Sequence, residues 1–170
     1  STILGQPVRI PLRSWALVLL GVWVVVQLVM PIRHLAIPGD VGWTEEGNYF
    51  AWHMILKDKT GYGEFTVSDP DTGSGWIVHP ADFLNEIQQR KMNARPQMIL
   101  DFAGYLEELL EAEGYQGWEV RGRFFASLNG RKHQALIKPE VDLSELSNPW
   151  MSHADWILPL EIPLSDRSLE

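Results

Sequence analysis

The sequence contains no cysteine among its 170 residues. This absence excludes disulfide bonds, thiolate metal sites, iron–sulfur clusters and cysteine nucleophiles. It does not identify the compartment, because a folded part of about 130 residues can bury a sufficient core without disulfides.

Recognisable catalytic and ligand-binding motifs are also missing. No P-loop, G-x-G-x-x-G or G-x-S-x-G pattern occurs. The histidines lack the H-x-H or H-x-x-x-H spacing that zinc sites use; they are scattered at His34, His53, His79, His133 and His153. We therefore expect no catalytic residue, no metal site and no cofactor in this chain.

Positive charge is scarce and unevenly distributed. The chain has 22 acidic and 14 basic side chains, for a net charge of −8. Residues 1–39 contain three basic side chains and no acid, so the remainder carries eleven basic side chains against all 22 acids. No run of Lys and Arg occurs, and an acidic domain is a poor ligand for phosphate backbones. Nucleic acid is therefore excluded as a partner.

One long apolar run stands out, from Trp15 to Ile32. It contains no charged residue and a single amide, Gln27. A membrane-spanning helix needs about 20 predominantly apolar residues, with roughly 17 as the lower limit. A cleaved signal peptide would have a shorter core and a small-residue cleavage site, and a buried core helix would be amphipathic. The run therefore predicts a single transmembrane helix in the lipid bilayer.

Basic residues near this helix predict its orientation. Arg9 and Arg13 precede it and Arg33 follows it, so the positive-inside rule places the N-terminus in the cytoplasm and the large domain in the periplasm or lumen. The predicted organisation is a cytoplasmic tail over 1–14, a transmembrane helix over 15–32, a juxtamembrane linker over 33–42 and an extracytoplasmic domain over 43–170.

The extracytoplasmic part is predicted to be a small α+β domain with an antiparallel sheet and two helices. Alternation and turn residues favour strands, and apolar positions at helical spacing favour helices. The predicted strands are 48–56, 64–67, 76–78, 119–128 and 134–137, and the predicted helices are 82–92 and 96–113. In the first helix Asp82 is the N-cap, and Phe83, Leu84 and Ile87 lie on one face. Beyond Glu140 the Pro-punctuated tail is expected to wrap the surface.

Several residues are candidates for contact with integral membrane protein subunits. Transmembrane helices approach one another through small and polar residues, and Gly21 and Gln27 are such positions on different faces of the predicted helix. Outside the membrane, the contact is expected to extend to Trp43, Glu45, Glu46 and Trp52. Trp43 is also the best-placed interfacial anchor, whereas the acidic pair alone would be solvated.

Two spaced patterns resemble the vitamin K-dependent γ-carboxylase-like proteins, the HTTM family. The first is Trp43-Thr44 followed by Phe50-Ala51-Trp52-x-Met54. The second contains Ser127, Asn129, Arg131, Gln134, Pro139 and Asp142 in the family's order, followed by Trp156-x-x-Pro159-Leu160. In this block, Asn129-Gly130 predicts a type I′ hairpin turn, and Arg131 and Asp142 are expected to tie the hairpin to the tail.

The resemblance implies a supporting and substrate-docking module rather than a reaction centre. In that family a preceding multi-span domain holds the lysine base and the pocket for reduced vitamin K. The lysines of this chain all follow the predicted span, so no catalytic residue carries over. Two functions therefore remain open. One is a complete, non-catalytic single-span accessory subunit of a larger membrane complex, for example photosynthetic or respiratory, as the Ser1-Thr2 start suggests. The other is a C-terminal fragment of a carboxylase-like enzyme.

Overall fold

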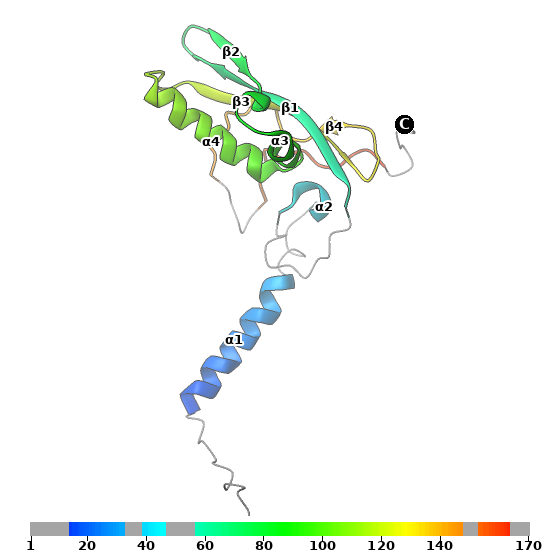
Figure 1. Ribbon diagram of the computed structural model, residues 1–170. Helices are drawn as coiled ribbons and strands as arrows, with labels where there is room; N and C mark the ends of the chain where they lie inside the picture. Colours follow the sequence, from blue (N-terminus) through cyan, green and yellow to red (C-terminus); the bar gives the residue numbers. More distant parts are fainter. Residues whose placement is uncertain (1–13, 33–38, 47–56, 148–152, 164–170) are drawn as a thin grey trace, which may run out of the picture.

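The structure, a computed structural model, describes residues 14–32, 39–46, 57–147 and 153–163. Within these residues one helix projects away from a domain in which helices lie against a four-stranded antiparallel sheet (Figure 1). This confirms the predicted α+β class. The predicted strand over 48–56 lies outside the described residues. The elements are α1 (Ser14–Ile32), α2 (Val41–Thr44), β1 (Lys59–Ser68), β2 (Gly75–Val78), η2 (Pro80–Asp82), α3 (Glu86–Asn93), α4 (Pro96–Ala112), β3 (Glu119–Leu128) and β4 (Gln134–Ala135).

Helix α1 coincides with the apolar run. It is long and apolar enough to cross a membrane, and only 6% of its most apolar stretch is buried within the chain. Bulky side chains along its length, such as Trp15 and Trp23, are 59% exposed. Figure 1 shows α1 extending away from the sheet rather than packing on it. Its apolar surface is therefore not part of the domain core.

The sheet has the strand order β2-β1-β3-β4. The hairpin between β1 and β2 is confirmed, although β1 begins at Lys59, earlier than the predicted Glu64. Its turn is stabilised by the carboxylate of Asp69, which accepts hydrogen bonds from the Asp71 backbone N–H at 2.9 Å and the Thr72 hydroxyl at 2.7 Å. Such side chain–backbone bonds are the reason that Asp favours turns.

The turn after β3 is the expected Asn-Gly turn. Asn129 and Gly130 both have positive φ, 54° and 73°, as a type I′ turn requires. Asn129 also exchanges two hydrogen bonds with Asp58, the residue before β1. Its N–H donates to the Asp58 carbonyl at 2.7 Å, and its side-chain oxygen accepts from the Asp58 N–H at 3.0 Å. Strand β4 ends at Ala135, because Ile137 instead forms an isolated bridge with Ile157 of the tail.

The first domain helix begins later than the sequence predicts. The N-cap of α3 is Asn85, whose side-chain oxygen accepts from the N–H groups of Ile87 and Gln88 at 3.1 and 3.0 Å. Gln88 in turn accepts from the Asn85 N–H at 3.1 Å, which completes a capping box. The predicted start at Asp82 is wrong, because Asp82 belongs to η2. Ile87, predicted to share one helix face with Phe83 and Leu84, is 58% exposed.

Helix α4 supplies the apolar layer over the sheet. Pro96 occupies its first turn, and its buried face includes Ile99, Phe102 and Leu106. The Phe102 ring lies 5.2 Å from that of Phe65 on β1, which in turn meets Phe124 of β3 at 4.8 Å. Burying each such ring stabilises the fold by roughly 1.5–3 kcal/mol. The core therefore lies between α4 and the central strands β1 and β3.

The C-terminal tail is fastened to the sheet by side chains of the second motif. Gln134 donates to the Pro159 carbonyl at 2.8 Å and accepts from the N–H groups of Glu161 and Ile162, each at 3.0 Å. Asp142 accepts from the Val120 N–H at 2.9 Å. These bonds hold the tail against β3 and β4.

The other motif residues also make local contacts. Ser127 donates to the Arg131 carbonyl at 2.6 Å, and Arg131 donates to the Leu128 carbonyl at 2.8 Å. Pro139 is exposed in a turn, whereas Trp156 is only 7% exposed and belongs to the core. Arg131 thus stabilises the hairpin turn itself, and the link from this region to the tail is made by Asp142 and Gln134.

Candidate functional site

A cluster of charged side chains surrounds Glu45, just after α2. Glu45 has a left-handed backbone, with φ of 62°. Its carboxylate lies 2.7 Å from the Lys57 ammonium, 3.7 Å from Nε of Arg95 and 4.0 Å from the Lys59 ammonium. We call these four residues the Glu45 cluster. It links α2, the start of β1 and the residue that precedes α4.

Lys59 is the buried member of the Glu45 cluster. Its side chain is 2% exposed, its ammonium donates to the Trp43 carbonyl, and it lies 5.1 Å from the centre of the Trp43 ring. Burial removes water from the ammonium and lowers the pKa of Lys59 to about 7, although Glu45 opposes this change. Lys57 and Arg95 lower that pKa further by charge repulsion. The folded structure therefore disfavours the charged form of Lys59.

The neighbouring Glu46 is engaged by the tail. One carboxylate oxygen accepts from the Ala154 N–H at 2.6 Å, and the other lies 2.9 Å from Nδ1 of His153. The side chains of Glu45 and Glu46 are 16% and 11% exposed. The expectation that this acidic pair is solvated is therefore wrong, because cations and N–H groups from remote segments converge on it.

The other sequence-derived contact candidates differ in their surroundings. Trp43 is fully buried, and its indole N–H donates to the Leu158 carbonyl at 2.7 Å. It has no surface to offer to lipid or to a partner. Gly21 and Gln27 are exposed on α1, and no atom lies within 4 Å of where a Gly21 Cβ would be. Trp52 lies outside the described residues. The role of Gly21 and Gln27 stays a prediction.

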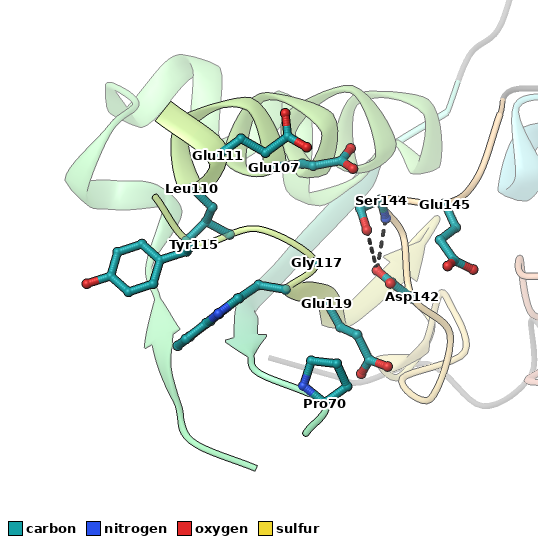
Figure 2. A pocket seen from close by; sticks show the side chains of 11 residues that line it. Pro70, Glu107, Leu110, Glu111, Tyr115, Gly117, Glu119, Asp142, Ser144 and Glu145 are labelled. Carbon is teal, nitrogen blue, oxygen red and sulfur yellow. Dashed lines mark hydrogen bonds between the residues drawn. The ribbon is translucent and has the colours of Figure 1, made fainter. Parts of the chain in front are cut away.

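A separate pocket of about 250 Å³ lies beside α4. Four segments meet around it: the second half of α4, the β1–β2 turn, the start of β3 and the loop after β4 (Figure 2). The lining residues are Pro70, Glu107, Leu110, Glu111, Tyr115, Gly117, Trp118, Glu119, Asp142, Ser144 and Glu145.

Negative charge dominates this pocket. Among the described residues, Glu107, Glu111 and Glu145 form no ion pair, whereas Glu119 pairs with Arg121 at 2.5 Å. Partial burial raises the pKa of Glu107, and repulsion from Glu111, Asp142 and two further glutamates adds to that rise. The pocket therefore holds carboxylates whose charge the described residues do not neutralise.

One acidic side chain of the pocket is fixed in place. A single oxygen of Asp142 accepts three hydrogen bonds, from the Val120 N–H at 2.9 Å, the Ser144 N–H at 3.1 Å and the Ser144 hydroxyl at 2.7 Å. Figure 2 shows the two bonds from Ser144. These bonds position the Asp142 carboxylate, and its second oxygen accepts no hydrogen bond from the described residues.

Aromatic side chains form the other part of the pocket. Tyr115 and Trp118 have ring centres 4.9 Å apart, and Trp76 of β2 contacts them at 5.4 and 4.9 Å. Trp76 and Tyr115 are 42% and 41% exposed. This aromatic cluster is consequently open to solvent beside the carboxylates.

Sequence reasoning missed the pocket. Glu107 and Glu111 belong to α4, whereas Asp142 and Glu145 lie about 30 residues further along the chain. The one local signal was the four-residue spacing of Glu107 and Glu111, which places them on the same side of a helix. Within the described ranges, no group of three or more His, Asp or Glu side chains could hold a metal ion.

Comparison with known protein families identifies one family whose model covers most of the chain. The family model for the vitamin K-dependent gamma-carboxylase lumenal domain matches residues 12–162. The chain belongs to this family. The matched residues include α1, the Glu45 cluster and the pocket, and the match confirms the resemblance inferred from the spaced motifs. Together with α1 it indicates membrane association. No solved structure matches the chain.

Proposed function

We propose that this lumenal-domain protein is a non-catalytic accessory subunit of a larger membrane protein complex, anchored by α1. The observation that carries the proposal is the exposed apolar surface of α1. Its Leu, Val and Trp side chains are about half exposed or more along most of its length. A continuous apolar surface of this kind marks a membrane or protein contact. In a bilayer it would contact lipid and neighbouring helices.

Two positions on α1 favour neighbouring helices. Gly21 allows a close approach of another backbone because nothing occupies the space around it. Gln27 carries the only amide of the apolar run, and a transmembrane amide is stabilised by hydrogen bonding to another helix. The two residues lie on different faces, which is compatible with more than one neighbour.

A second candidate function is supported by the family match itself. The chain can be the lumenal part of a vitamin K-dependent carboxylase-like enzyme whose reaction centre lies in another membrane domain. In this case α1 would pack against that domain. Both candidates require a membrane partner, and they differ in whether the assembly carboxylates glutamate.

The test is affinity purification of the full chain from native membranes in a mild detergent. We expect it to co-purify with integral membrane proteins, and we expect Gly21→Leu with Gln27→Leu to weaken that association. Val22→Leu with Val26→Leu is a matched control on the same helix. Circular dichroism should show an intact extracytoplasmic domain in each variant.

The outcomes separate the candidates. Recovery of the chain only as a free monomer would overturn the accessory-subunit proposal. Carboxylation of a glutamyl peptide by the purified assembly with reduced vitamin K, lost when this chain is removed, would replace it with the enzyme candidate. An inactive assembly that loses this chain in the double variant supports the accessory role.

A further inference from the structure

The pocket beside α4 has two chemically different ends. Glu107, Asp142 and Glu145 provide carboxylates, whereas Tyr115 and Trp118 provide aromatic surface. In Figure 2, Tyr115 lies at the end away from Asp142 and Glu145. A ligand that fits both ends would combine an apolar stem with a positively charged head.

The size of the pocket limits what can occupy it. Its volume of about 250 Å³ is below the roughly 300–1,000 Å³ of pockets that enclose drug-sized ligands and cofactors. A single long side chain or a small amine is of suitable size. Calcium needs six to eight oxygen ligands at about 2.3–2.6 Å, and the described residues contain no cluster that could hold a metal.

Arginine fits these properties best. Its three-carbon stem can lie along aromatic surface while its guanidinium reaches carboxylates. The planar guanidinium also stacks on aromatic rings and binds carboxylates with paired hydrogen bonds, which the lysine ammonium does not do. Glu107 and Glu111, without a cationic partner among the described residues, offer such acceptors.

We propose that this pocket binds an arginine side chain presented by a partner protein. The aromatic cluster contacts the stem and the α4 glutamates, with Asp142, receive the guanidinium. The proposal depends on the pocket alone and not on α1, so it does not rest on the accessory-subunit function. A free small amine shares part of this chemistry, and the experiment distinguishes it.

The test is a titration of the full chain in detergent with N-acetyl-arginine amide, followed by the indole ¹H–¹⁵N resonance of Trp118. We expect a saturable shift with this probe and none with the neutral citrulline analogue. Glu107→Gln with Glu111→Gln should raise the Kd by about tenfold or more, because charge-assisted contacts are lost. Glu108→Gln with Glu113→Gln is the matched control, since both residues are exposed on or just after α4 and do not line the pocket.

Several results would overturn the proposal. One is no resonance shift with N-acetyl-arginine amide. Another is equal weakening of its binding by the two double variants. A third is binding of N-acetyl-lysine amide at least as tightly as N-acetyl-arginine amide. Saturation by spermidine or Ca²⁺ without binding of the arginine probe would assign the pocket to a free amine or a metal instead. If the pocket double variant fails to fold, the single change Glu111→Gln, at an exposed residue, provides the same comparison with Glu108→Gln.

Discussion

Replacing the buried Lys59 should change how the stability of the domain depends on pH. Lys59→Met removes an ammonium that is only 2% exposed while keeping a long apolar side chain. Glu45 retains Lys57 at 2.7 Å and Arg95 at 3.7 Å, so the variant does not leave that carboxylate without a cation. The pH dependence of the stability difference between the variant and wild type therefore reports the cost of burying the Lys59 charge.

The sign and size follow from the pKa of Lys59. Its decrease from 10.5 to about 7 means that the folded state holds fewer protons than the unfolded state between these values. The wild-type free energy of unfolding should therefore rise with pH across this window, by about 1.4 kcal/mol per pH unit and about 5 kcal/mol in all. Above the window, the neutral amine still donates to the Trp43 carbonyl, worth about 1 kcal/mol.

We therefore expect Lys59→Met to be more stable than wild type at neutral pH and slightly less stable near pH 10.5. Thermal unfolding of the full chain in detergent, followed by near-ultraviolet circular dichroism from about pH 6 upward, measures this difference. Lys91→Met, at an exposed position on α3, is the control and should show no comparable trend. A difference between Lys59→Met and wild type that stays constant with pH would refute the reasoning.

Three further predictions concern the turn, the pocket and the tail. Gly130→Val should lower the free energy of unfolding by about 1–3 kcal/mol through backbone strain alone, because its φ is +73° and the surrounding space is open, and an unchanged Tm would contradict the turn. As a control, Gly104→Ala in the interior of α4, where the space is also open, should raise the free energy of unfolding by about 0.5–1 kcal/mol. Glu107→Gln should raise the Tm at neutral pH, since the raised pKa of Glu107 means that its ionised carboxyl destabilises the folded state. The gain in Tm should vanish below the ordinary glutamate pKa of 4.5, and a gain that persists at lower pH would contradict this explanation. Gln134→Leu removes three hydrogen bonds to the tail and should speed limited proteolysis after Pro159, whereas resistance equal to wild type would show that other contacts hold the tail.

Elements with strong local signals could be read from the sequence. Strand β3 has the predicted bounds, and the Asn129-Gly130 turn follows it. Helix α4 begins at Pro96 as predicted and is followed by Gly114 with φ of +93°. These features depend on backbone restrictions of Pro and Gly and on side-chain periodicity, which operate within a few residues. The family could also be recognised, because its motifs are spaced along the chain.

Two adequate N-cap residues compete for the start of α3. Asp82 and Asn85 are both good N-cap residues. Only Asn85 is followed three residues later by a glutamine that completes a capping box, and this places the start of α3 beyond the predicted position.

The sequence by itself determined an apolar helix, an acidic domain of the α+β class and the family. Only the tertiary structure decided which charges are buried and which remain without partners. Glu45 meets Lys59 and Arg95 from other segments, and Glu107 faces Asp142 across a pocket that no local pattern encodes. The physical reason is that charge interactions depend on distance in space and on exclusion of water, and both arise only after remote segments have packed together.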